Sequence, residues 1–95
     1  MGQILSLKFL YDDKEYYSLL RVKEKDNTKE YHITVMNGDL ESRLYGNHVI
    51  KEAEGLLSVE LPEDDEVAKI KLQISDELSK YLNMKMVVLS YKLPA

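Results

Sequence analysis

Hydrophobic side chains recur at every second position through the first part of the chain, and this period constrains the fold more than any other feature. Leu5, Leu7, Phe9 and Tyr11 fall on one side of such a pattern, and the ranges 16–25 and 31–37 alternate in the same way. Alternation over five or more residues, rich in Leu, Val, Ile and Tyr, is typical of a strand with one buried face. The sequence therefore predicts a β-rich chain.

Turn-forming residues separate these alternating runs. Asn and Asp bond their own nearby backbone and tolerate left-handed geometry, which Gly reaches without steric cost. Asn37-Gly38 between two strands is the strongest short hairpin signal in the chain. The ranges 40–45, 48–53 and 56–61 continue the alternation less regularly, and the predicted turns are Asp12-Asp13-Lys14, Asp26-Asn27-Thr28, Asn37-Gly38-Asp39, Gly46-Asn47 and Glu54-Gly55. Together they predict an antiparallel meander.

The segment 67–82 fits two structures. As one helix, it would gather Val67, Ile70, Ile74, Leu78, Tyr81 and Leu82 on one face, with Lys71 intruding on that face and Leu72 pointing away. As a strand, the range 68–74 alternates without error, and Ser75 would then cap a short helix over Asp76–Leu82. We favour the strand followed by the short helix, and the single helix stays open.

The range 86–93 closes the predicted fold as a last strand. We expect residues 1–95 to form a single domain of the mainly β or α+β class, an antiparallel meander of about seven or eight strands with one short C-terminal helix before the last strand. So long a sheet in so short a chain must curl to cover its apolar face. A small barrel and a strongly bent sheet are both compatible with the pattern.

Composition and charge exclude several classes of function. The chain has no Cys, which rules out disulfides and thiolate metal sites, and we expect a cytoplasmic protein that does not insert into a membrane. The formal net charge is −4, and much of the acidic excess lies in the range 60–66. Binding a polyanion requires clustered cations, so nucleic acid is an unlikely partner.

Two histidines, His32 and His48, are the only imidazoles. His48 lies near Asp39 and Glu41 in the sequence, so a small enzyme that uses His48 with Asp39 or Glu41 is one alternative. Metal sites need three or four converging ligands, and the sequence lacks a recurrent ligand spacing and a nucleophile motif. We therefore expect no catalytic residues, no metal and no cofactor, and interpret both histidines as surface or turn residues.

Tyrosine is the unusual component of the sequence, with seven Tyr, one Phe and no Trp. Tyr11, Tyr16 and Tyr17 flank the first predicted turn, and Tyr31 opens the third strand; we take these four as candidate interaction residues. Aromatic rings on a sheet can anchor a protein interface. The range 87–89, Val-Val-Leu, is apolar on both strand faces, so it is either central in the sheet or paired across an interface. We therefore expect a non-enzymatic module that binds a protein or its own copy.

The stretch 72–85, "LQISDELSKYLNMK", resembles the strand, short helix and bend of AbrB-type DNA-binding antitoxin domains. The matching residues are Glu77, Leu78, Leu82, Met84 and Lys85, whereas Asn83 replaces a glycine and the Gly-Asp pair expected after the lysine is absent. The resemblance covers about fourteen of the 95 residues. It implies a swapped-hairpin dimer that binds DNA, which makes a nucleic-acid-binding domain a further alternative. Such a domain would need a positive patch, for which Lys8, Arg21, Lys23 and Arg43 are the candidates.

Overall fold

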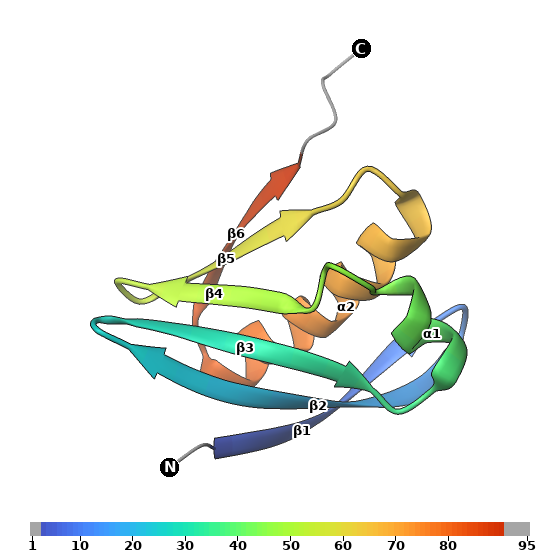
Figure 1. Ribbon diagram of the computed structural model, residues 1–95, viewed down its shortest axis with the longest axis horizontal. Helices are drawn as coiled ribbons and strands as arrows, with labels where there is room; N and C mark the ends of the chain where they lie inside the picture. The colour runs from blue at the N-terminus through green and yellow to red at the C-terminus, as the bar shows by residue number, and fades with distance from the viewer. Residues whose placement is uncertain (1–2, 91–95) are drawn as a thin grey trace.

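A computed structural model describes residues 3–90 and contains one sheet of six strands and two helices (Figure 1). The strands lie in the sheet in chain order, β1-β2-β3-β4-β5-β6. Strands β1 to β5 pair antiparallel, and β6 pairs parallel with β5. The elements are β1 (Gln3–Tyr11), β2 (Lys14–Lys25), β3 (Thr28–Val35), α1 (Gly38–Arg43), β4 (Val49–Ala53), β5 (Leu56–Leu61), α2 (Asp65–Leu82) and β6 (Lys85–Ser90).

The turns after β1, β2 and β4 lie where the sequence predicts them. Asp12 and Asp13 take positive φ angles of 50° and 62° between β1 and β2, and Asp26 takes 57° between β2 and β3. Gly55 has φ of 78° between β4 and β5, where a side chain would be strained. Short polar residues and Gly tolerate this left-handed backbone, which tightens the connection between adjacent antiparallel strands.

The hairpin predicted at Asn37-Gly38 is wrong, and so is the strand predicted over 40–45. The side chain of Asn37 accepts a hydrogen bond from Leu40 N (3.1 Å) and so caps the N-terminus of α1. A type I′ hairpin needs positive φ at both central residues, whereas Gly38 is not among the residues with positive φ. Leu40 and Leu44 are both buried and lie one helical turn apart, and their burial favours the helix.

The strand followed by a short helix that we favoured for 67–82 is also wrong, because α2 runs unbroken from Asp65 to Leu82. Asp64 caps its N-terminus by accepting hydrogen bonds from Glu66 N and Val67 N. The acidic run therefore lies at the positive end of the helix dipole. Asn83, at φ 53° and ψ 51°, ends the helix in the left-handed conformation. The strand that the AbrB resemblance implies at the start of 72–85 is thus helical.

These two helices account for the strand count of six instead of seven or eight, while the α+β class is confirmed. Helix α2 also changes the topology, because it carries the chain back along the sheet and leaves β6 parallel to β5 rather than antiparallel. The sheet does not close into a barrel: β1 and β6 lie at opposite edges of it.

Helix α2 lies on one face of the curved sheet and packs against β1, β5 and β6 (Figure 1). The core side of the sheet supplies alternate residues of each strand, as the sequence pattern predicts. The largest fully buried side chains of the core are Phe9, Leu20, Leu44, Ile50, Leu57, Ile70, Ile74 and Leu78. The opposite face of the sheet carries the alternate, mostly exposed residues.

Candidate functional site

The four candidate tyrosines lie on opposite faces of the sheet and do not form one surface. Tyr11 and Tyr31 are buried on the core face, and their hydroxyls donate to the carboxylates of Glu66 and Glu52. Their rings therefore belong to the core, and their hydroxyls bind carboxylates of the same chain. The hydrogen bond to Glu66, and then burial, raise the pKa of the Tyr11 phenol. Burial, and then the hydrogen bond to Glu52, raise the pKa of the Tyr31 phenol.

Tyr16 and Tyr17 are neighbours in the chain and lie on opposite faces of the sheet, with Tyr16 on the core face opposite Phe9. Tyr16 is half-buried, and its ring lies 5.9 Å from that of Phe9. Tyr17 is 54% exposed on the outer face, where the Lys8 ammonium lies 6.0 Å from its ring centroid. Of the four tyrosines, Tyr17 offers the most ring surface to a partner, and the interaction role of the set stays a prediction.

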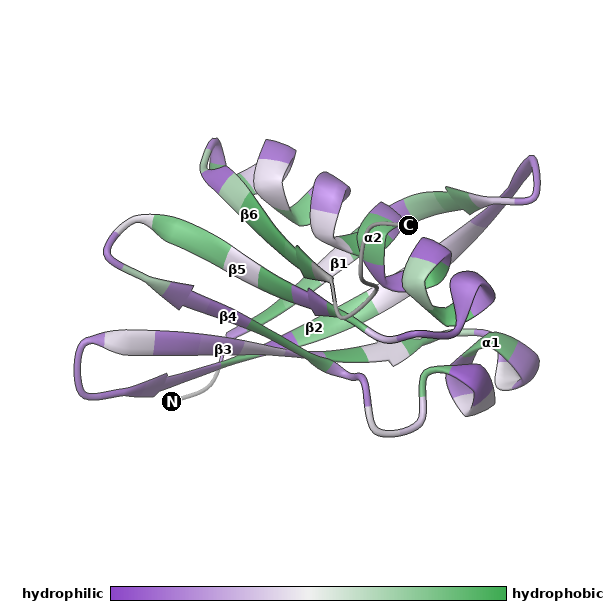
Figure 2. Ribbon diagram, turned by 90° about the horizontal axis from the view of Figure 1, so that it is seen from above, coloured by the Kyte–Doolittle hydropathy of each residue, from purple (hydrophilic) through white to green (hydrophobic). Residues whose placement is uncertain are grey.

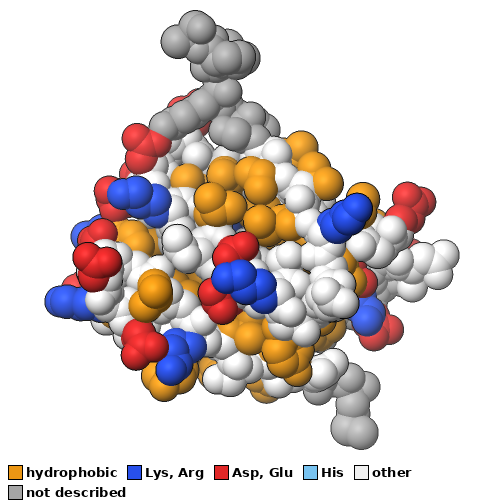
Figure 3. Space-filling model, turned by 180° about the vertical axis from the view of Figure 1, so that it is seen from behind, with side chains coloured by type: hydrophobic (Ala, Val, Ile, Leu, Met, Phe, Trp, Pro, Cys, Tyr) orange, Lys and Arg blue, Asp and Glu red, His pale blue; other side chains and the backbone are white. Residues whose placement is uncertain are grey.

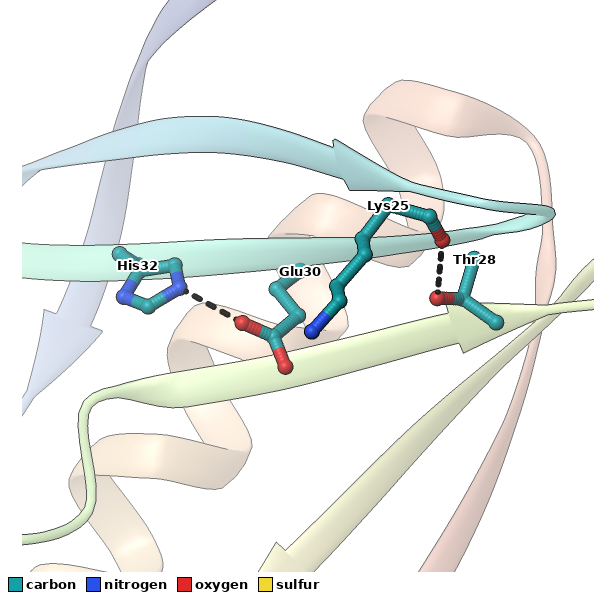
Figure 4. A network of polar contacts seen from close by, with 4 residues as sticks. All are labelled: Lys25, Thr28, Glu30 and His32. Carbon is teal, nitrogen blue, oxygen red and sulfur yellow. Dashed lines mark hydrogen bonds and ion pairs between the residues drawn. The ribbon is translucent and has the colours of Figure 1, made fainter.

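His32 lies on the outer face of β3 and is half-buried. Its Nε2 atom is 3.0 Å from Glu30 Oε1, two residues earlier on the same strand (Figure 4). Thr28 donates to the carbonyl of Lys25 across the neighbouring turn. The Thr28–Lys25 bond spans the turn of the β2–β3 hairpin, whereas the His32–Glu30 contact lies within β3.

His48 and Glu41 are brought together, whereas Asp39 is exposed on α1. The His48 Nε2 atom is buried and lies 3.1 Å from Glu41 Oε2, without the alignment of a hydrogen bond. The other carboxylate oxygen of Glu41 accepts from Val35 N at 2.8 Å. Glu41 thus ties α1 to the end of β3 as well as contacting the imidazole.

A shallow depression of about 260 Å³ borders this pair on the outer face of the sheet, and Arg21, His32 and Thr34 also line it. A carboxylate beside an imidazole can orient a general base. Here the same carboxylate already receives a backbone N–H, and it is held in place by the helix it belongs to. The geometry therefore explains Glu41 as a structural link between α1, β3 and the loop before β4.

Strand β6 is the part of the molecule with the most unusual exposure. It pairs with β5 on one side, and no described residue pairs with its other side. Val87, Val88 and Leu89 are consecutive, so they belong to both faces of the strand, and they are 44%, 42% and 47% exposed. Figure 2 shows β6 as a hydrophobic strand at the edge of the sheet. This run, which we expected to be either central or paired across an interface, lies at the edge. Of the last strand predicted over 86–93, the part up to Ser90 belongs to β6, and residues 91–93 lie outside the described residues.

The other edge of the sheet, β1, is protected differently. Lys8 lies in the middle of β1, and its ammonium is 3.2 Å from the Glu15 carboxylate on β2. A charged side chain on an edge strand opposes pairing with another strand, because the charge would have to be desolvated. Strand β6 has Lys85 at its start and only Met86, Val87, Val88, Leu89 and Ser90 after it. The structure thus has one edge with a central charge and one without.

The view from behind shows hydrophobic side chains gathered on the surface, next to a central group of acidic and basic side chains (Figure 3).

Within residues 3–90, no helix is both long and apolar enough to span a bilayer. In the same part of the chain, no three His, Asp or Glu side chains converge to hold a metal ion. The cytoplasmic location stays a prediction.

Comparison of the chain with protein-family models, with curated proteins and with solved structures finds no significant match.

Proposed function

We propose that this protein is a non-enzymatic interaction module that self-associates by pairing β6 with β6 of a second copy. The observation that carries the proposal is the free edge of β6, with which no strand of residues 3–90 pairs and which is hydrophobic from Met86 to Leu89 after the one charged residue, Lys85. An edge strand presents a row of backbone N–H and C=O groups that another strand can satisfy. Soluble proteins usually protect such an edge with a charge, as β1 does with Lys8.

The sequence of β6 suits a second copy of itself. In an antiparallel pair about a two-fold axis normal to the sheet, each residue faces one of the same parity, so that the two sheets continue with matching faces. With Val88 opposite Val88 of the second copy, Val87 faces Leu89 on the outer face, and Leu89 faces Val87. Every one of these cross-strand pairs is hydrophobic, and such pairs stabilise a sheet.

The exposed area of β6 sets the strength of this association. Burying a whole Val or Leu side chain contributes about 1.5–3 kcal/mol. Three residues in each copy are a little under half exposed, so the hydrophobic gain is at most about 4–8 kcal/mol in total if pairing buries all of that area. Association costs about 4–15 kcal/mol, so the added strand hydrogen bonds decide the balance. We therefore expect a reversible dimer with a dissociation constant in the micromolar range or weaker.

Sedimentation equilibrium over a wide range of protein concentration tests this proposal. The wild-type chain is expected to shift from monomer to dimer as concentration rises. Val88→Lys would place two lysine side chains directly opposite each other across the two-fold axis, with Cβ atoms about 4.5–5.5 Å apart. Because like charges in this position repel, the variant is expected to remain monomeric. Leu10→Lys is the matched control, because Leu10 is 55% exposed on the β1 edge; it is expected to dimerise like the wild type. A wild-type chain that stays monomeric at millimolar concentration would refute the proposal.

The nucleic-acid alternative is less well supported, because two of the four candidate cations lie next to acidic side chains. Lys8 pairs with Glu15, and Lys23 lies opposite Glu30 in the β2–β3 register. Acidic side chains therefore lie next to these cations and lower the positive potential that phosphates require. Gel-shift assays at low and moderate salt separate this alternative from self-association, since the proposal expects no retardation at either salt concentration.

A further inference from the structure

Strands β4 and β5 separate soon after the turn that joins them. Their paired residues are Ala53 with Leu56, Glu52 with Leu57 and Lys51 with Ser58. Beyond Lys51 and Ser58 the two strands diverge (Figure 1), and a partly open cleft of about 250 Å³ lies at this point. The cleft is lined by Gly46, Asn47, Val49, Lys51, Ser58, Glu60, Leu61, Pro62 and Lys71.

Lys71 reaches this cleft from α2, on the core side of the sheet. It is 4% exposed, and its ammonium donates to the main-chain carbonyl of Glu60 at 2.6 Å. This bond uses one of three ammonium donors. In the sequence, Lys71 is the one charged residue on the apolar face of the helix over 67–82, and this irregularity can be recognised without the structure. Desolvating an ammonium group is costly, so a lysine on a buried helix face requires polar or charged groups that compensate this cost.

Lys51 also lines the cleft, and its charge acts on Lys71. Burial lowers the pKa of Lys71, and the positive charge of Lys51 lowers it further, whereas the carboxylate of Glu60 raises it. Among the residues that line the cleft, Lys51 and Lys71 carry positive charges and Glu60 carries a negative charge. Glu30, which does not line the cleft, lies opposite Lys51 in the β3–β4 register. A small anion would reduce the repulsion between the two ammonium groups and the cost of desolvating Lys71.

We infer that this cleft binds a small oxyanion, a carboxylate or phosphate group, between the ammonium groups of Lys51 and Lys71. Ser58 adds a hydroxyl donor at the rim, and Asn47 adds an amide whose other N–H bonds the carbonyl of Tyr45. Charge-assisted bonds from ammonium donors are the strong ones in such a site. The volume equals that of about eight water molecules, so the ligand is a small metabolite-sized anion rather than a macromolecule. The site lies on β4, β5 and α2 and does not depend on the pairing of β6.

Chemical-shift titration of the isotopically labelled protein tests this inference. Sodium phosphate and sodium acetate are added in separate titrations at constant ionic strength, with sodium chloride as the reference. We expect the amide signals of Gly46, Ser58 and Lys71 to shift saturably with phosphate, with acetate or with both. A shift with only one of the two anions distinguishes a phosphate ligand from a carboxylate ligand. Shifts that match those with chloride in both titrations would overturn it.

Two variants locate the site, and one controls for charge. Lys71→Met keeps the length of the side chain, and Lys51→Met changes an exposed residue whose removal leaves the core intact; each is expected to weaken binding at least tenfold. Lys69→Met removes the same charge from an exposed position of α2 and is expected to bind as the wild type does. Equal binding by all three variants would contradict the assignment. If Lys71→Met does not fold, Lys51→Met alone decides.

Discussion

Glu41 gives the sharpest test of whether the His48–Glu41 pair is structural. Its Oε1 atom accepts the backbone N–H of Val35 at 2.8 Å, at the end of β3, where Val35 is buried. Glu41→Ala removes this acceptor and leaves a buried N–H without its partner, which costs about 1–3 kcal/mol. The neighbouring imidazole contact is not an aligned hydrogen bond and adds little. We therefore expect Glu41→Ala to lower the free energy of unfolding by about 2 kcal/mol.

Glu41→Gln is the matched control, because a carboxamide oxygen can still accept from Val35 N. It is expected to lose less than about 1 kcal/mol, the part that depends on the acceptor being charged. Urea unfolding followed by circular dichroism measures both values. At about 4–8 °C per kcal/mol for a domain of this size, Glu41→Ala should also lower the melting temperature by about 8–16 °C. If Glu41→Ala were as stable as the wild type, or Glu41→Gln as unstable as Glu41→Ala, the structural explanation would fail.

Two further predictions concern the core. The pKa of Tyr31 is raised from its ordinary value of 10.0 by burial and by its hydrogen bond to Glu52, so its contribution to stability is complete below pH 10 and is lost as the pH rises above that value. Tyr31→Phe should therefore have a lower free energy of unfolding at neutral pH, and this free energy should fall less steeply with pH in the alkaline range. If it fell as steeply as in the wild type, the assignment would be wrong. Ile74→Ala should cost about 2–5 kcal/mol because Ile74 is fully buried on α2, whereas Leu72→Ala, at a half-exposed position, should cost much less; similar losses in thermal unfolding would instead favour the alternating strand.

The strands β1 to β3 and their turns could be predicted because each signal is local. Leu5, Leu7 and Phe9 are buried on one face, and a period of two places them there whatever the rest of the chain does. The residues at Asp12-Asp13 and Asp26 favour a left-handed turn by their own chemistry. No distant contact is needed to decide these elements.

The two helices could not be assigned in this way. In the range 68–74 the alternation of apolar residues fits a strand, and only the packing of α2 against β1, β5 and β6 decides for the helix. Likewise, Asn37-Gly38 suits either a hairpin or a helix cap, and the burial of Leu40 and Leu44 decides between them. Tertiary packing overrides local preference in both segments.

The candidate site was predicted only in part. The run Val87–Leu89 was identified as a strand with two hydrophobic faces, but its place at the edge depends on the parallel return of the chain through α2. The large number of tyrosines suggested an interaction surface, but two of the four candidates, Tyr11 and Tyr31, are buried. The sequence shows Lys71 as an irregularity on the apolar face of a helix. The cleft that Lys71 lines could not be predicted, because it forms only where β4 separates from β5.

Oxidative cross-linking through a single introduced thiol tests β6 self-pairing most directly, because the natural chain has no Cys. Residues directly opposite each other in antiparallel strands have Cβ atoms about 4.5–5.5 Å apart, close to the spacing of a disulfide. Val88→Cys, opposite its own copy, is therefore expected to form a covalent dimer under mild oxidation, and Leu10→Cys on the β1 edge is expected to stay largely monomeric. Equal rates of dimer formation by the two variants, or none by Val88→Cys, would contradict the pairing.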